Sequence, residues 1–136
     1  MTTPTDATES TAADVVSVTV PADVAYVSTL RLAAASLAAR CDLTVDDIED
    51  LRLAVDEACS LLLPHAAPSS VISAHFELTS GQLLVEASVA TAEVAEPDRE
   101  GFAWTVLGAL TNSVHVPDQD GRLTIVLTKT REATQR

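Results

Sequence analysis

Apolar residues follow two different periods in the first half of the chain. In residues 14–20 (DVVSVTV) valine returns at every second position, which predicts a strand with one apolar face. Residues 22–41 and 44–63 carry apolar residues three and four positions apart, so each segment is expected to form a helix with an apolar stripe. Thr44 and Asp47 resemble a capping box at the start of the second helix, and a proline follows directly after residue 63 and is expected to end it.

The second half returns to the two-residue period. Four segments are expected to form strands: residues 71–78, 83–90, 113–116 and 122–130. Residues 79–82 (TSGQ) predict the turn of a hairpin between the first two of them. The polar, acidic residues 91–100 are expected to form a loop, and residues 101–112 a short helix.

The order of these elements predicts an α+β fold. Alternating strands need one buried face, and three helices with apolar stripes can cover it, so a two-layer α/β sandwich is expected, with a mixed sheet of about five strands under three helices. The domain is expected to span residues 14–130. Residues 1–13 and 131–136 are polar and are expected to be flexible ends.

Composition and charge exclude several classes of function. The 136 residues carry a net charge of −12, which argues against direct contact with nucleic acid, because phosphate binding needs clustered Lys and Arg. An acidic surface suits a basic protein partner or simply solubility. No apolar run reaches the ~20 residues of a membrane span, and no signal peptide is expected. Cys41 and Cys59 match no metal or redox spacing and are expected to be buried thiols of a reduced, cytoplasmic protein.

Two stretches carry a resemblance to a known family. "LRLAVDEACSLLLPHA" (residues 51–66) is similar to the N-box helix of the small bacterial anti-sigma factors with a histidine-kinase-like (GHKL) ATPase fold, which are serine kinases. "EGFAWTVLGALTNSVHV" (residues 100–116) resembles the glycine-containing end of the lid, the third helix and the following strand of that family. The resemblance covers residues 14–130 and implies the histidine-kinase-like ATPase form of the two-layer fold.

The resemblance implies roles for particular residues. Glu57 matches the glutamate that serves the family as the base for the attacking serine, a role that a carboxylate near a γ-phosphate can fill. Four residues later the family has an asparagine that holds Mg²⁺, and here the residue is Leu61, which has no oxygen to offer. Gly101 stands at the glycine-rich lid, where the family binds ATP. ATP and Mg²⁺ are therefore the cofactors that the family implies, and no other metal site is expected.

The glycine-rich elements of the family are reduced in this chain. An Asp-x-Gly-x-Gly element follows the third strand in the family and binds adenine through its aspartate, whereas this region (residues 86–94) reads EASVATAEV and has no glycine. Glu86 is one candidate for a displaced acid. The lid Gly-x-Gly is reduced to Gly101-Phe102-Ala103. Without glycine the backbone approaches a phosphate less readily, so the chain is expected to bind a nucleotide poorly, if at all.

Three interpretations of Glu57 stay open at this point: an ordinary solvated helix acid, the remnant of a catalytic site, or an active base. The family uses an arginine at the position of Arg31 to contact its protein partners, although a lone arginine can also lie along the helix surface. Trp104 is expected to pack in the core. The three histidines lack the spacing of metal ligands.

Three functions follow as alternatives. The first is an anti-sigma factor that sequesters an alternative sigma factor of the stress or sporulation type and is released by an anti-anti-sigma partner. The second is an active ATP-dependent serine kinase that phosphorylates the anti-anti-sigma factor. The third is a relative by fold alone with another protein partner. The family analogy also implies a homodimer.

Overall fold

The computed structural model describes residues 13–119 and 121–133. The elements, in chain order, are β1 (Asp14–Pro21), the 3-10 turn η1 (Val24–Tyr26), α2 (Val27–Arg40), α3 (Val45–Leu62), the 3-10 turn η2 (Leu63–His65), β2 (Val71–Thr79), β3 (Gln82–Ala90), α4 (Phe102–Leu110), β4 (Ser113–His115) and β5 (Arg122–Thr130). Every predicted helix and strand is confirmed within one or two residues, except that the first predicted helix begins as η1. The expected N-terminal tail lies almost entirely outside the described residues.

The five strands form one sheet in the order β1-β2-β3-β5-β4. All four neighbouring pairs are antiparallel, so the expectation of a mixed sheet was wrong. The chain connects β3 to β4 through the single helix α4, and such a crossover makes these two strands run in the same direction. β3 and β4 do not pair with each other, because β5 lies between them. The sheet therefore contains no parallel pair of neighbouring strands, although β3 and β4 run in the same direction.

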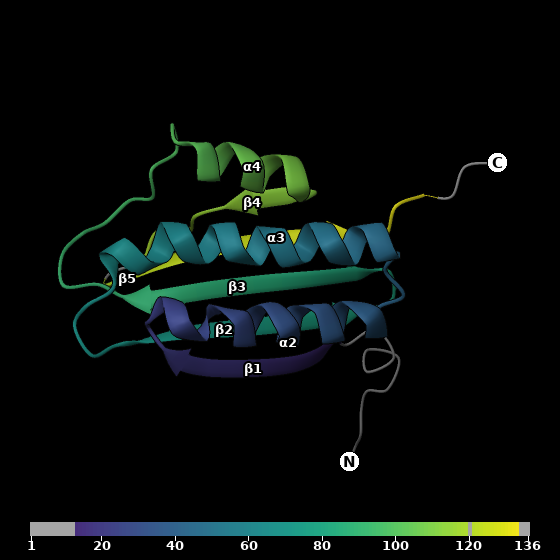
Figure 1. The fold of residues 1–136 in the computed structure, drawn as a ribbon, viewed down its shortest axis with the longest axis horizontal. Coiled ribbons are helices and arrows are strands. Elements are labelled where there is room, and N and C mark those ends of the chain that lie inside the picture. Colours follow the sequence, from purple (N-terminus) through teal and green to yellow (C-terminus); the bar gives the residue numbers. More distant parts are fainter. Residues whose placement is uncertain (1–12, 120, 134–136) are drawn as a thin grey trace, which may run out of the picture.

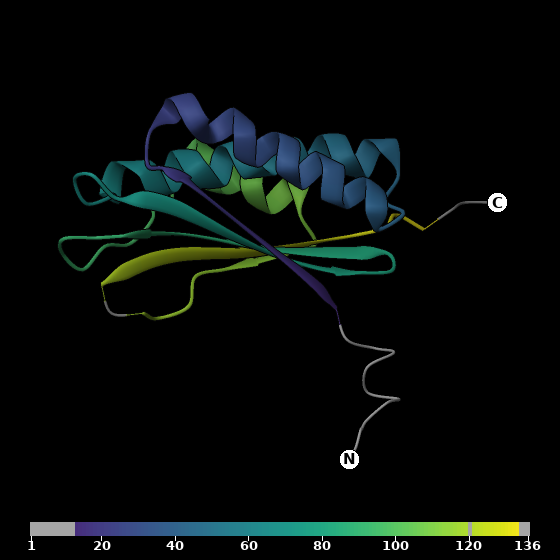
Figure 2. The same cartoon turned by 90° about the horizontal axis from the view of Figure 1, so that it is seen from below.

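The helices α2, α3 and α4 cover one face of the sheet, and the other face is open (Figures 1 and 2). The side chains that alternate inward from the strands meet the apolar stripes of the helices and form one core. Its largest fully buried members include Phe76, Leu30, Leu51, Leu62 and Ile125. The two-layer sandwich is therefore confirmed, and α3 lies at its centre, packed against α2, α4, β3 and β5.

The capping box at the start of α3 is also confirmed. The Asp47 N–H donates to Thr44 Oγ1 at 3.1 Å, and the Thr44 N–H donates to Asp47 Oδ2 at 3.1 Å. The Asp47 carboxylate accepts a second bond, from the N–H of Glu132 at 3.0 Å, and this bond joins the chain after β5 to the start of α3. At the other end α3 ends at Leu62. The chain then continues directly into η2, which contains Pro64.

Asp47 predicts a pH dependence of stability. Burial raises the pKa of its carboxyl, but the bonds from Glu132 and Thr44 and the charge of Lys129 outweigh burial, so the pKa lies below its ordinary value. A lowered folded pKa stabilises the fold above the unfolded pKa of about 3.9, and this stability is lost as the pH falls through the folded pKa. Asp47→Asn is expected to cost about 1–2 kcal/mol at pH 7 and progressively less below pH ~3.9, measured by urea unfolding.

The neighbouring acid supplies the control for this test. Asp46 is also in the first turn of α3 but is exposed, so it shares the helix-dipole effect without the buried hydrogen bonds. Asp46→Asn is expected to change stability by less than about 0.5 kcal/mol at either pH. Equal losses in the two variants would show that the helix dipole, and not the buried carboxylate, accounts for the effect.

Candidate functional site

The region that the family resemblance singles out lies at one end of the molecule. It consists of the C-terminal half of α3, the ends of β3 and β5 below it, α4 beside it, and residues 91–100, the linker from β3 to α4. Figure 1 shows the linker passing round the end of the sheet before it enters α4. The half of α3 that carries Glu57 and Leu61 therefore lies at the same end of the molecule as the linker that leads to Gly101 and α4.

Glu57 is half-buried on α3. Its backbone carbonyl accepts a hydrogen bond from Ser60 Oγ at 2.7 Å, but within the described residues its carboxylate takes part in no hydrogen bond or ion pair. The neighbouring Asp56 is the residue that pairs with Arg31, so Arg31 and Glu57 are not brought together. Glu57 therefore contributes no contact to the fold that would explain its charge.

Leu61 lies one helical turn after Glu57 and belongs to the hydrophobic core. Its side chain is 7% exposed and is part of the same cluster as Leu62 and Ala58. A hard cation such as Mg²⁺ requires oxygen ligands, and this position presents only hydrocarbon. A buried leucine thus occupies the position at which the family resemblance places the metal ligand.

The end of β3 is equally apolar on the side that faces the helices. Its last two inward side chains are Ala87 and Val89, both buried. Glu86 lies on the opposite, open face of the sheet, where its cross-strand neighbours are His75 and Val126. Because side chains alternate across a strand, Glu86 cannot face the helices, and its candidacy as a displaced adenine-binding acid was wrong.

Gly101 is the residue before α4 and has an ordinary extended backbone, with φ −84° and ψ 172°. A Cβ atom at this position would lie only 2.7 Å from Oδ2 of Asp98. The carboxylate of Asp98 also accepts a hydrogen bond from the Glu100 N–H at 3.1 Å. The small size of Gly101 thus makes room for an acid of the chain's own linker. This acid would repel a phosphate brought to the same place.

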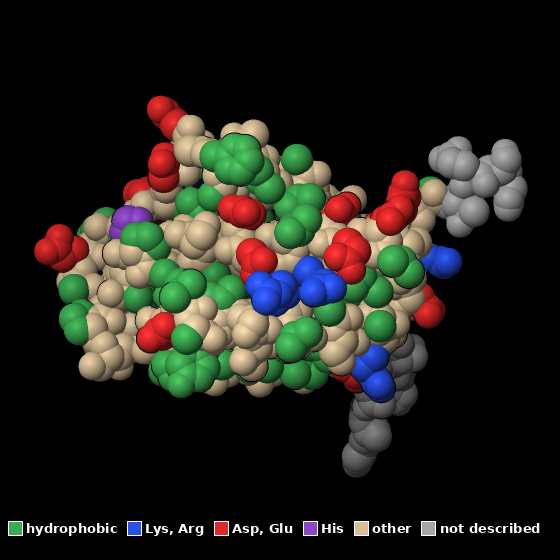
Figure 3. All heavy atoms as spheres, viewed as in Figure 1, with side chains coloured by type: hydrophobic (Ala, Val, Ile, Leu, Met, Phe, Trp, Pro, Cys, Tyr) green, Lys and Arg blue, Asp and Glu red, His purple; other side chains and the backbone are tan. Residues whose placement is uncertain are grey.

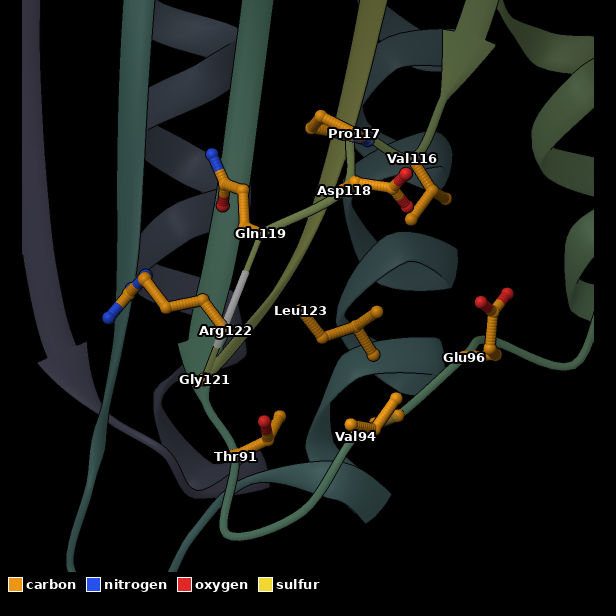
Figure 4. A pocket seen from close by; sticks show the side chains of 11 residues that line it. Thr91, Val94, Glu96, Val116, Pro117, Asp118, Gln119, Gly121, Arg122 and Leu123 are labelled. Atoms are coloured by element: carbon orange, nitrogen blue, oxygen red, sulfur yellow. The ribbon is translucent and has the colours of Figure 1, made fainter.

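A hollow of about 290 Å³ lies beside the linker, between residues 91–96 and residues 116–123 (Figure 4). Its charged lining residues are Glu96, Asp118 and Arg122. In Figure 4 the Arg122 side chain extends across the strands, away from the two acids, and its guanidinium donates to Ser88 Oγ at 2.6 Å. The hollow is at the lower limit for an organic ligand, and the guanidinium of Arg122, the one cation among its lining residues, is turned toward Ser88.

Arg99, a second cation near this end, is engaged as well. Its guanidinium lies 5.3 Å from the centroid of the Trp104 ring, within cation–π range, and 3.8 Å from Glu96. Lys129 lies at the opposite end of β5, where it is almost fully buried and donates to Asp50 at 3.2 Å and to the carbonyl of Leu110 at 2.9 Å. Trp104, expected in the core, packs only partly against it. The residues present therefore do not fit Mg-ATP, and no step of chemistry is derived through it.

A second feature lies on the outer face of the helical layer. The Arg31 Nη1 of α2 donates to Asp56 Oδ1 of α3 at 2.7 Å, and both side chains are 31% exposed. The pair lines a groove of about 400 Å³ between the two helices, with Val24, Val27 and Leu63. Figure 3 shows Lys and Arg side chains in the middle of this face and Asp and Glu side chains around them.

The remaining titratable candidates show no catalytic arrangement. Burial and, secondarily, Asp56 raise the pKa of the Cys59 thiol to about 12, so this cysteine is an unreactive part of the core. Cys41 is also buried, as expected. No group of three or more His, Cys, Asp or Glu side chains suited to a metal occurs in residues 13–119 and 121–133. No helix in that part of the chain is long and apolar enough to cross a membrane.

Comparison with known proteins shows the family of the chain and several proteins that are similar to it. A family model described as "Histidine kinase-like ATPase domain" matches residues 20–129, and the chain belongs to this family. The anti-sigma-F factor RsbW of Mycobacterium tuberculosis (strain ATCC 25618 / H37Rv) is 38% identical over 104 residues, which cover 70% of this chain and 61% of that protein. The serine-protein kinase RsbW of Bacillus velezensis is 44% identical over 57 residues, 42% of this chain and 36% of that protein.

A solved structure has the same fold. The RsbU and RsbW domains of Rv1364c from Mycobacterium tuberculosis match with a TM-score of 0.62 at 19% identity, over 89% of this chain and 35% of that one. The chain spans 61% or less of the length of these three relatives. The family and the fold are thereby confirmed, and the activity of the whole relatives is taken up below.

Proposed function

We propose that the protein is an anti-sigma regulatory factor that sequesters an alternative sigma factor, of the stress or sporulation type, without using a nucleotide. The similar protein of Mycobacterium tuberculosis is named an anti-sigma-F factor. The observation that carries the proposal is the buried Leu61, one helical turn after a Glu57 carboxylate that has no hydrogen bond or ion pair within the described residues. At the position where the family has its metal-binding asparagine, this chain has a buried leucine. A protein without that ligand is better suited to binding a partner than to transferring a phosphate. Glu57 is then the remnant of a catalytic base.

The surface charge suits such a partner. Residues 44–63 hold six acids against one base, and the linker adds further acids. The sigma surfaces that engage DNA are basic, so an acidic protein that masks them gains association rate from electrostatic steering. We place this complex in the cytoplasm, away from direct contact with nucleic acid. Release occurs when an anti-anti-sigma protein competes for an overlapping surface.

Arg31 is proposed as a contact residue for these partners, and Asp56 supplies a matched control. Each variant, Arg31→Ala or Asp56→Ala, breaks the same half-exposed ion pair, which contributes less than about 1 kcal/mol to stability. Only Arg31→Ala removes a guanidinium that a partner can bind. We expect it to weaken capture of the sigma factor at least about tenfold, and Asp56→Ala to weaken it less than about threefold.

Co-purification of tagged protein from bacterial lysate, with mass spectrometry of the captured proteins, identifies the partner. The affinity of each variant for that partner is then measured by biolayer interferometry. Recovery of no sigma factor would contradict the proposed function. Equal losses of affinity in the two variants would instead contradict the contact role of Arg31 and leave only a role in joining α2 to α3.

The alternative function is an active serine kinase that phosphorylates the anti-anti-sigma factor. Two observations favour it: the similar proteins of Bacillus are named serine-protein kinases, and the Glu57 carboxylate has no hydrogen bond or ion pair within the described residues. It requires phosphate transfer from Mg-ATP to a serine of the partner, abolished by Glu57→Ala. The missing metal ligand opposes it.

A further inference from the structure

Helix α4 is apolar on all sides but is only partly covered by the rest of the molecule. Its nine residues, FAWTVLGAL, include one polar side chain, that of Thr105, and only Leu107 is buried. Phe102 is 80% exposed, and Val106, one turn later on the same face, is half-buried and lies outside the core cluster. Because a helix that is apolar all round is normally buried, the outer face of α4 is available to another molecule.

The start of α4 lies beside the part of α3 that carries Glu57. Lys129 fixes how the two helices are aligned, because its Nζ donates both to Asp50 on α3 and to the Leu110 carbonyl at the end of α4. The helices run in opposite directions (Figure 1), and each rises by about 1.5 Å per residue. Phe102, eight residues before Leu110, therefore lies level with the turn of α3 that is about eight residues after Asp50 and includes Glu57.

The adjoining side of α3 adds an apolar residue and an acid. Asp50, Leu53 and Glu57 are spaced three and four residues apart, so they share the side of the helix that faces α4. Leu53 is 51% exposed, and the Glu57 carboxylate has no hydrogen bond or ion pair within the described residues. Figure 3 shows hydrophobic side chains over α4 and along this margin of α3, with acidic side chains among them. Leu53, Glu57, Phe102 and Val106 are called the α3–α4 surface below.

Acids of the linker border the α3–α4 surface. The linker carries one base, Arg99, against four exposed acids: Glu93, Glu96, Asp98 and Glu100. The guanidinium of Arg99 already lies 3.8 Å from Glu96, so it neutralises only part of this charge. Apolar side chains bordered by acids suit a partner that is apolar on one side and basic on its flanks. They disfavour a second copy of this acidic chain and an anionic membrane, because like charges repel.

We propose that the α3–α4 surface binds an amphipathic helix of the captured sigma factor. The apolar stripe of that helix packs on Leu53, Phe102 and Val106, as in other helix-in-groove complexes, and its basic residues meet Glu57 and the linker acids. The inference rests on the proposed function for the identity of the partner, and it adds where and by which chemistry the partner is held. It gives the Glu57 carboxylate a role that needs neither metal nor nucleotide. The surface is distinct from the groove of Arg31, which lies between α2 and α3.

Binding of a model peptide tests the surface without the sigma factor. The probe is a fluorescein-labelled helical peptide of about 18 residues, with leucines three and four residues apart and lysines elsewhere, and its twin has glutamate at every lysine position. Fluorescence anisotropy is expected to give at least about tenfold tighter binding for the lysine peptide. Phe102→Ser is expected to weaken its binding at least about tenfold, and Leu32→Ser, at a 61% exposed position of α2, less than about twofold.

Glu57 and Glu86 form a matched pair for the charged part of the surface. Both are half-buried glutamates, but Glu86 lies on the open face of the sheet. Glu57→Gln is expected to weaken binding of the lysine peptide about three- to fivefold and to reduce its salt dependence, because one ion pair is lost. Glu86→Gln is expected to change the affinity less than about 1.5-fold. Circular dichroism checks that all variants are folded.

The sigma factor recovered by co-purification provides the second test. Phe102→Ser is expected to weaken its capture at least about tenfold. A recovered sigma factor that binds Phe102→Ser as tightly as the wild type would overturn this inference and leave the proposed function standing. Recovery of no sigma factor would contradict the proposed function and, with it, the partner named here, even if the lysine peptide binds.

Three further results would overturn the proposal. The first is equal affinity for the lysine and glutamate peptides, and the second is equal weakening by Phe102→Ser and Leu32→Ser. The third is a change in what else covers the surface: a solution mass, measured by light scattering, that falls in Phe102→Ser, or binding of the wild type to phosphatidylserine vesicles that Phe102→Ser lacks. Those two outcomes would assign the surface to a second copy of the chain or to a membrane.

Discussion

Replacing Leu61 with asparagine is expected to destabilise the protein by about 3–5 kcal/mol and to restore no metal site. The substitution removes a buried branched side chain and introduces an amide among Ala58, Leu62 and the rest of the core. The amide finds no hydrogen-bond partner there, so its desolvation adds to the loss of packing. Urea unfolding measures the change, and a fall in Tm of roughly 10 °C or more accompanies it.

Leu53 provides the matched control on the same helix. Its side chain is 51% exposed, so Leu53→Asn makes the same chemical change with little change of packing, and is expected to alter stability by less than about 0.5 kcal/mol. Both variants lower helix propensity equally, and the comparison therefore isolates burial. If Leu61→Asn were as stable as Leu53→Asn, position 61 would face an open site, and our description of the core would be wrong.

Much of the fold could be predicted from the sequence because its signals are local. The capping residues Thr44 and Asp47 and the stripe that follows them define α3, and strict alternation defines β2 and β3. The direction of the strands could not be predicted in the same way. It depends on β5 inserting between β3 and β4, a long-range choice that no local pattern records.

The candidate site was predictable only in part, for a similar reason. The spacing of Glu57 and Leu61 gave both the resemblance to a catalytic helix and the missing ligand. The alternation of apolar residues in β3 already indicated that Glu86 lies on the face away from Ala87 and Val89, and the pairing with β5 agrees with it. The approach of Asp98 to Gly101 and the pairing of Arg31 with Asp56 join segments that the sequence leaves unrelated. In the sequence, only the glycine at position 101, directly after an acidic linker, indicated the approach of Asp98 to Gly101.

Binding of Mg-ATP is expected to be absent, and its absence would separate this protein from an active kinase. A nucleotide at this site would need an oxygen ligand for the metal where Leu61 is buried, and a polar partner for adenine where β3 presents Ala87 and Val89. Its phosphates would meet the Asp98 carboxylate at Gly101, while Arg122 is turned toward Ser88 and Arg99 is held by Trp104 and Glu96. Each mismatch costs binding free energy, and together they remove the metal and phosphate contacts on which phosphoryl transfer depends, whatever the state of Glu57.

Calorimetric titration of Mg-ATP into the nucleotide-free protein tests this account most directly. We expect no saturable heat up to about 1 mM nucleotide, which corresponds to a binding free energy weaker than about −4.1 kcal/mol. Magnesium-dependent, saturable binding with a micromolar Kd would contradict the account, since it would require a polar, metal-holding pocket where the structure has packed hydrocarbon.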